Sequence, residues 1–269
     1  MLLSMVPCDV LAHVVTFLEL RMHPVLVETC MHFALAVRTW REGRRSIRAD
    51  GEAMSFMLRP SWSHASYPRL NTLELTSWIH TSMLRYVLDA CPLLKSVSLV
   101  RGRNAHVALI ACRPLVVHLS LRGSSRITSL APLANLLELD IAYCTNVTSI
   151  RFLQRSPFLR KLDMCGCYRV DDVEILGTFC TRLESVLLCS CHRATDDVVV
   201  ALARGCTQLK YVDVSRCIHL TDFAFETLVR SCVNLQSIYT LGCVSMKSHI
   251  QLPPPYISNS FESSVVYSD

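Results

Sequence analysis

The sequence predicts an α/β solenoid, a fold in which short strands and helices recur along the chain and stack on one another. Three observations predict it: an apolar pattern that recurs eight times, cysteines at fixed offsets from that pattern, and capping residues that precede apolar runs. The chain has 269 residues, of which 51% are hydrophobic and 18% charged. This composition supplies enough apolar surface to fold and excludes a largely disordered protein.

The apolar pattern is L-x-x-L-x-L, with Val, Ile or Met allowed at each apolar position. Because side chains alternate along a strand, the second and third apolar positions are expected to fill a core shared by neighbouring copies. Successive copies start 20 to 26 residues apart, and Thr240 interrupts the last one. The copies begin at Leu70, Leu94, Val116, Leu136, Leu159, Leu183, Leu209 and Leu235.

Cysteines recur at two places in the pattern. A buried thiol is small and can donate weakly to a backbone carbonyl, so we expect these cysteines to pack where the chain turns from strand to helix. One series follows the third apolar position by three residues, and the other precedes the first leucine by three. The first series is Cys144, Cys167, Cys191, Cys217 and Cys243, and the second is Cys180, Cys206 and Cys232.

Helix starts are predicted between the two cysteine series. The segments 171–174, 195–198 and 221–223 place Asp or Thr before apolar residues, which is typical of a helix N-terminus. Pro132 and Pro157 interrupt the shorter copies. These copies have too few residues for a full helix and are expected to contain short 3₁₀ turns.

Taken together, the pattern resembles the cysteine-containing leucine-rich repeat, C-x-x-L-x-x-L-x-L-x-x-C followed by an apolar residue and Thr-Asp. Residues 206–222 match it at nearly every position, and the resemblance extends from about Leu70 to Cys243. It implies a horseshoe of about eight repeats over residues 70–247, with a concave face formed by the strands.

The outward strand positions predict a partner-binding strip on this concave face, because concave solenoid surfaces commonly bind other molecules. The strip combines acidic residues in the middle repeats with apolar anchors further along, Leu241 among them. An ordinary solvated face is the alternative. The predicted residues are Glu138, Asp140, Lys161, Asp163, Leu187, Tyr211, Asp213 and Tyr239.

Residues 1–48 have a different pattern, with apolar residues spaced as in two or three short helices. The segment 6–11 and a later Cys30 resemble an F-box, although Val6, Thr29 and Phe33 depart from its usual Leu, Val and Trp. An F-box before cysteine-type repeats is the order found in the F-box and leucine-rich-repeat proteins. The resemblance implies binding to a Skp-type adaptor through Pro7, Val10, Leu11, Val14, Leu18 and Leu26.

Two alternatives for the ends of the chain stay open. The N-terminal helices can instead cap the first repeat, with residues 49–69 as a linker or N-terminal cap. The Pro/Ser-rich tail, residues 248–269, contains a segment that resembles a WW-domain ligand, at Pro253, Pro254 and Tyr256. A tail packed over the last repeat is the alternative to such a ligand.

The sequence contains no motif for catalysis, a cofactor or a structural metal, so we expect a non-enzyme. Cys165 and Cys189 fall at outward positions of neighbouring strands, about 5 Å apart, which leaves metal or redox chemistry as a minor alternative. A net charge of +5 does not by itself indicate a nucleic-acid partner. The longest stretch without Asp, Glu, Lys or Arg is too short for a membrane span.

Two functions follow from these expectations. The resemblance implies the substrate-recognition subunit of a Skp–cullin–F-box ubiquitin ligase, with the target on the concave face. The alternative is a scaffold subunit of a larger assembly, such as the ciliary axonemal dynein regulatory complex, with a degenerate F-box as a cap. The first twenty residues lack Lys and Arg, unlike a targeting leader, so a cytoplasmic location is expected, with the nucleus or cilium as alternatives.

Overall fold

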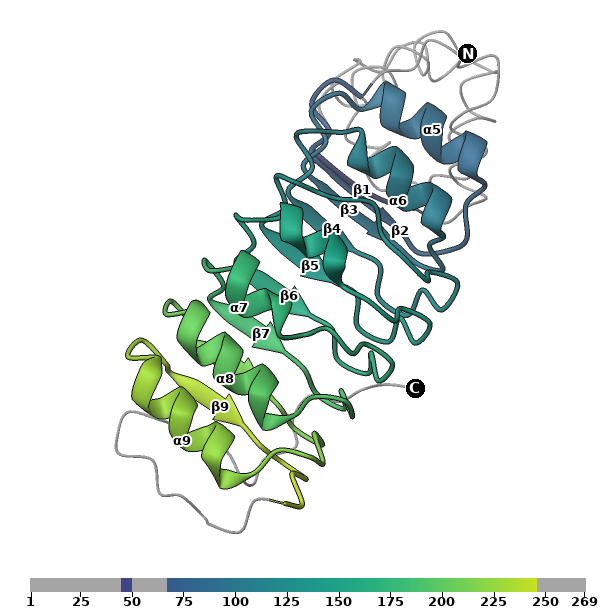
Figure 1. Cartoon of the computed structure of the whole chain (residues 1–269). Helices are drawn as coiled ribbons and strands as arrows, with labels where there is room; N and C mark the ends of the chain where they lie inside the picture. The colour runs from purple at the N-terminus through teal and green to yellow at the C-terminus, as the bar shows by residue number, and fades with distance from the viewer. Residues whose placement is uncertain (1–44, 50–66, 246–269) are drawn as a thin grey trace, which may run out of the picture. The chain divides into compact units, whose positions relative to one another are not determined.

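The computed structural model describes residues 45–49 and 67–245 of the chain (Figure 1). These residues belong to two compact units, which divide between Arg101 and Gly102. The expected F-box-like helices, the six adaptor-binding residues and the C-terminal tail lie outside the described residues.

The described residues of the first unit, 45–49 and 67–101, form three parallel strands, β1 (Ser46–Ala49), β2 (Thr72–Leu75) and β3 (Ser96–Leu99), and the helix α5 (Thr81–Ala90). In register, Ile47 lies beside Leu73 and Leu73 beside Val97, and all three side chains are buried. The apolar pattern did not predict β1, and the expected boundary at residue 48 falls inside it. The sequence Ser-Ile-Arg-Ala of β1 contains one large apolar residue, Ile47, which is too short an apolar signal to be recognised from the sequence.

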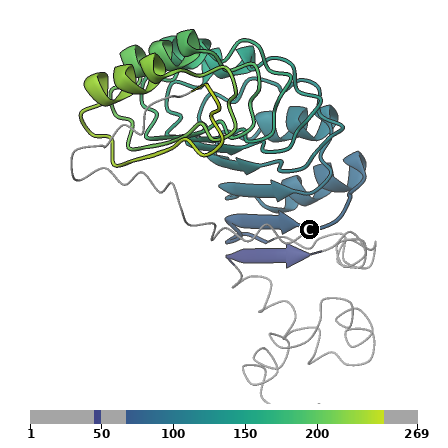
Figure 2. The same ribbon diagram turned by 90° about the horizontal axis from the view of Figure 1, so that it is seen from below.

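Within residues 102–245, the second unit contains six short strands and five helical segments. Figures 1 and 2 show its α-helices on one side of the strands, with α8 and α9 side by side. Its strands are β4 (His118–Ser120), β5 (Glu138–Asp140), β6 (Lys161–Asp163), β7 (Ser185–Leu187), β8 (Tyr211–Asp213) and β9 (Ser237–Tyr239). Its helices are α6 (Asn104–Ala111), the 3₁₀ helix η3 (Arg151–Arg155), α7 (Ile175–Phe179), α8 (Asp196–Gly205) and α9 (Asp222–Ser231).

The strands of the second unit are parallel and pair in chain order with no shift in register. Their central residues therefore form one row, and every member of that row is at most 2% exposed. This arrangement confirms the predicted strand–turn–helix repeats within residues 102–245. The row consists of Leu119, Leu139, Leu162, Val186, Val212 and Ile238.

The helix starts agree with the sequence in two repeats and differ in a third. The helices α8 and α9 begin directly after Thr195 and Thr221, as predicted. The helix α7 begins only at Ile175, because Asp172 does not cap it. Instead, Asp172 accepts hydrogen bonds from the Ile150 N–H, at 2.9 Å, and from a serine hydroxyl in the preceding repeat. The predicted 3₁₀ turn is confirmed before Pro157 as η3, whereas the copy that contains Pro132 has no helical turn between β4 and β5.

None of the helices in the described ranges is both long enough and apolar enough to cross a bilayer.

A left-handed backbone conformation recurs two residues after the third apolar position. It turns the chain away from the strand in each repeat from Arg101 onward. Glycine occupies this position three times, and Gly166 has a second constraint, since a Cβ there would lie 2.8 Å from the Tyr143 ring. The positions are Arg101, Gly123, Tyr143, Gly166, Ser190, Arg216 and Gly242.

The first cysteine series connects each repeat to the one before it. The Cys167 thiol, for example, donates to the Ile141 carbonyl oxygen at 3.1 Å, and the Cys191 thiol donates to the Met164 carbonyl oxygen at 3.2 Å. Cys144, Cys217 and Cys243 make the equivalent bond at 3.1–3.2 Å. The expected thiol-to-carbonyl bond is therefore confirmed, and it adds a second donor to a buried carbonyl oxygen that already accepts a backbone N–H of its own turn.

The burial of these side chains predicts how much stability the protein loses when one of them is shortened. Leu162→Ala and Leu188→Ala are each expected to lower the free energy of unfolding by about 2–5 kcal/mol, because both side chains are at most 1% exposed. Leu115→Ala, at a position 44% exposed, is the matched control and should change it by less than about 0.5 kcal/mol. Urea unfolding measures all three, and equal effects at the buried and exposed leucines would contradict the register.

Candidate partner-binding surface

The eight residues of the predicted strip all lie at outward positions of the strands in the second unit. Register places Asp140 beside Asp163, Asp163 beside Leu187, and Leu187 beside Asp213. Tyr239 continues this line on β9. Glu138, Lys161 and Tyr211 occupy the position two residues earlier on their strands. The structure therefore gathers the predicted residues on one strand face.

Glu138 is bound from both neighbouring strands. Its Oε1 atom lies 2.7 Å from Lys161 Nζ, and its Oε2 atom lies 3.2 Å from His118 Nδ1. Burial alone would raise the pKa of Glu138, but the hydrogen bond and charge of Lys161, together with His118, outweigh it and hold that pKa below its usual value. Glu138 and Lys161 thus form a local ion pair.

Arg122 bridges the two acidic residues next to this ion pair. Its Nη1 atom lies 3.0 Å from Asp163 Oδ2 and 3.7 Å from Asp140 Oδ1, and its guanidinium sits 5.2 Å from the centre of the Tyr143 ring. Burial raises the pKa of Asp140, and the charge of Asp163 adds to the effect, while Arg122 opposes both. The sequence gave no sign of this bridge.

The aspartates also cap the ends of their own strands. The Oδ1 atom of Asp140 accepts the Ala142 N–H at 3.0 Å, and that of Asp213 accepts the Ser215 N–H at 2.8 Å. Asp163 binds the N–H of Cys165 in the same way, at 3.0 Å. Asp favours such turns because its carboxylate reaches the backbone two residues further on. The turn after each strand is therefore a sufficient reason for aspartate at these positions, independent of any partner.

Apolar side chains are exposed at the other end of the strand face. Tyr211 and Tyr239, on the neighbouring strands β8 and β9, are 43% and 38% exposed. Leu241, two residues after Tyr239, is 60% exposed. Leu187 is half-buried between the two aspartates beside it. The strand face thus changes from paired charges on β5 and β6 to apolar side chains on β8 and β9.

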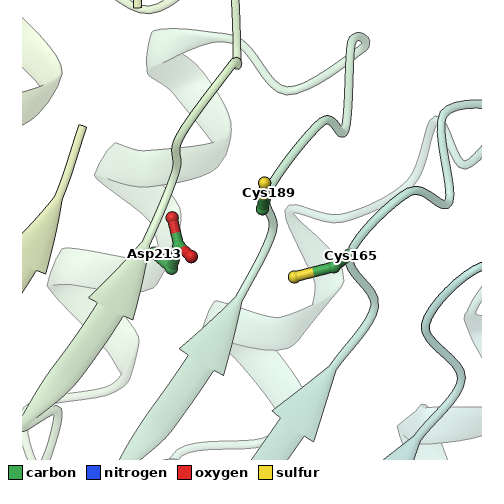
Figure 3. A group of neighbouring side chains, drawn as sticks. All are labelled: Cys165, Cys189 and Asp213. Atoms are coloured by element: carbon green, nitrogen blue, oxygen red, sulfur yellow. The ribbon is translucent and has the colours of Figure 1, made fainter. Parts of the chain in front are cut away.

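A cluster of Cys165, Cys189 and Asp213 lies between these two regions (Figure 3). The ligand atoms of the three residues lie within 4.8 Å of one another. The hydrogen bond from the Cys165 thiol lowers the pKa of Cys189 to about 7, although burial opposes it and the Ser190 hydroxyl assists it. The same bond, with burial and the charge of Asp163, raises the pKa of Cys165 well above its usual value. The expected proximity of the two thiols is confirmed, but the sequence did not indicate Asp213 as their neighbour.

The other predicted sites stay untested. The adaptor-binding positions from Pro7 to Leu26 and the tail residues Pro253, Pro254 and Tyr256 lie outside the described residues.

Comparison with known proteins finds likenesses in structure but none in sequence. No protein-family model matches the chain, and no curated protein matches it. Among solved structures, the chain is similar to the crystal structure of the Rad7 and Elc1 complex in yeast. The likeness covers 84% of this chain and 77% of that chain, at 13% identity and a TM-score of 0.46. This likeness adds nothing to the repeat geometry already described.

Arg122→Gln tests the charge bridge. The pKa of Asp140 is expected to rise further, because the substitution removes a charge that lowers it. A raised folded-state pKa contributes stability that is fully present below the unfolded pKa of about 4 and is lost as pH rises through the folded value. The variant should therefore be less stable than wild type mainly at neutral pH, by about 0.2–1 kcal/mol.

Carboxyl NMR titration and urea unfolding at pH 4 and pH 7 measure these two effects. Arg160→Gln is the control, because Arg160 pairs with Glu184, at 3.0 Å, and should leave the pKa of Asp140 unchanged. A stability loss that is equal at both pH values would show that the bridge does not act through charge.

Proposed function

We propose that the chain is a non-catalytic protein-interaction subunit that holds a protein partner on the strand face of residues 102–245. The observation that carries this proposal is the exposure of Tyr211, Tyr239 and Leu241 at one end of a face whose other end carries paired charges. Aromatic side chains dominate the binding energy of many interfaces, and polar groups around them set orientation.

The charged half of the face supports selectivity more than affinity. Exposed ion pairs contribute little net energy, but a partner that fails to match them must desolvate charges without compensation. Glu138 with Lys161, and Arg122 with its two aspartates, present such a fixed pattern. The proposed partner therefore places an apolar segment on β8 and β9 and a polar segment on β5 and β6.

Within this proposal, the role favoured is the substrate-recognition subunit of a Skp–cullin–F-box ubiquitin ligase. Its support is the order of motifs in the sequence, an F-box-like segment at residues 6–33 before cysteine-type repeats. The N-terminal segment would bind the adaptor, and the strand face would present the target to an enzyme carried by other subunits. A scaffold subunit whose N-terminal helices only cap the repeats is the competing role.

The strand face is tested by replacing its aromatic anchors. Proteins that co-purify with the full-length chain should be lost from the Tyr211→Ala/Tyr239→Ala variant, since removal of such anchors weakens binding about tenfold or more. The control is Phe179→Ala/Phe223→Ala, which removes two exposed aromatics from α7 and α9. Quantitative mass spectrometry compares the sets, and losses that are the same in both variants would contradict the proposed face.

The adaptor role is tested by co-expression of the full-length chain with a Skp-type adaptor. Leu11→Asp/Leu18→Asp should abolish co-purification of the adaptor, because two charges would enter an apolar helix contact. The matched control is Leu93→Asp/Leu115→Asp, at leucines 49% and 44% exposed, which should retain it. If wild type does not bind the adaptor while its strand-face partners remain, the scaffold role is correct.

A further inference from the structure

The Cys165–Cys189–Asp213 cluster arises from the register of three successive repeats. Cys165 and Cys189 occupy equivalent positions two residues after β6 and β7, and the Gly166 N–H donates to the Cys189 carbonyl oxygen at 2.7 Å. Asp213 ends β8, the next strand. Figure 3 shows the Cys165 side chain directed toward the strand that carries Cys189, with Asp213 on the opposite side. Rigid parallel pairing therefore holds the three side chains together.

We propose that Cys165, Cys189 and Asp213 bind one zinc ion, with a fourth coordination position open to water or to a side chain of a bound protein. Tetrahedral zinc takes sulfur at about 2.3 Å and carboxylate oxygen at about 2.0–2.2 Å, so its ligand atoms lie roughly 3.5–4 Å from one another. The three ligand atoms already lie within 4.8 Å. Zinc binding would therefore require the ligand atoms to move closer by about 1 Å.

The donor set selects zinc over other common cations. Two thiolates and one carboxylate are a sulfur-rich set, whereas calcium and magnesium take oxygen ligands. Three protein ligands with one open position are also the arrangement of zinc sites that exchange a ligand. The open position is accessible from the side of Cys189 and Asp213, which are only half-buried, whereas Cys165 is buried.

Asp213 differs from the other aspartates of the strand face in its charged neighbours. Asp140 and Asp163 share the Arg122 guanidinium. Within residues 45–49 and 67–245, no ion pair involves Asp213. Its Oδ1 atom accepts the Ser215 N–H at 2.8 Å, which fixes the carboxylate without neutralising it. A cation beside Cys189 would pair with this carboxylate.

The cluster is also distinct from the cysteine series of the core. The core thiols point inward and donate to backbone carbonyl oxygens, as Cys167 does to Ile141 and Cys191 to Met164. Cys165 and Cys189 lie instead at the outward position that Ala142 and Ser215 occupy in the flanking repeats. Two consecutive repeats with cysteine at this position create a donor pair that the repeat fold does not itself require.

Metal titration of the reduced, full-length chain tests the site. After chelator treatment, Co²⁺ serves as a spectroscopic probe and Zn²⁺ as its competitor. One equivalent of Co²⁺ should produce thiolate-to-cobalt charge-transfer absorption and the visible bands of tetrahedral cobalt, and Zn²⁺ should displace it. Cys189→Ser should abolish these bands, and Asp213→Asn should weaken Co²⁺ binding at least tenfold.

Matched controls separate the cluster from other cysteines and other acids. Cys112→Ser, at an exposed cysteine of the same unit, and Asp140→Asn, at the equivalent acidic position of β5, should leave the spectrum and the affinity unchanged. Circular dichroism of the metal-free variants shows whether Cys189→Ser is folded, and Asp213→Asn provides the test if it is not.

Three outcomes would overturn the proposal: no cobalt bands in the wild type, bands that persist in Asp213→Asn with unchanged affinity, or an equal loss in Cys112→Ser. A Cys165–Cys189 disulfide that forms in the presence of zinc, detected by peptide mass spectrometry, would also overturn it. The inference does not rest on the proposed function, because metal binding is measured without a protein partner.

Discussion

The structure depends on the register between neighbouring repeats. Each repeat has apolar side chains that it cannot bury alone, so the next repeat must present its own row at the same level. In residues 102–245 the central strand residues align without a shift, from Leu119 on β4 to Ile238 on β9. A slip of one residue would turn every buried row outward, which makes the register strongly specified. The outward columns exist only because this alignment holds.

The turn after each strand preserves the register. A left-handed residue there costs about 1–2 kcal/mol when it is not glycine, as at Tyr143 and Ser190. The cost is tolerated because the following cysteine enters the core and its thiol binds a carbonyl of the preceding repeat, as Cys191 binds Met164. Burial raises the pKa of Cys144 to about 11, so that thiol remains protonated and serves as a donor.

Structural features that recur in every repeat can be predicted from the sequence, whereas features that occur in a single repeat cannot. The leucine spacing and the cysteine offsets recur many times, so the strands, the buried rows and the thiol bonds could all be predicted. In contrast, β1 contains a single large apolar residue, Ile47, and α7 begins late because Asp172 binds the preceding repeat. Such single events leave no periodic signal.

The surface illustrates the same limit. The strand face could be predicted residue by residue, because outward positions follow from alternation. The Arg122 bridge to Asp163 spans 41 residues and depends on side-chain conformations that no spacing encodes. The approach of Asp213 to the two thiols likewise requires three strands to be placed at once.

The ion pairs of Arg122 and Lys161 reduce the net negative charge that the acidic residues give to the strand face. Arg122 and Lys161 place two positive charges beside the three carboxylates of β5 and β6, so one negative charge is left to attract a basic partner over a distance. Affinity must then come from the apolar end, where Tyr239 stands beside Asp213 in register. Asp213 is thus a carboxylate at the boundary between the apolar end and the cysteine pair, where a cation and a partner side chain can meet.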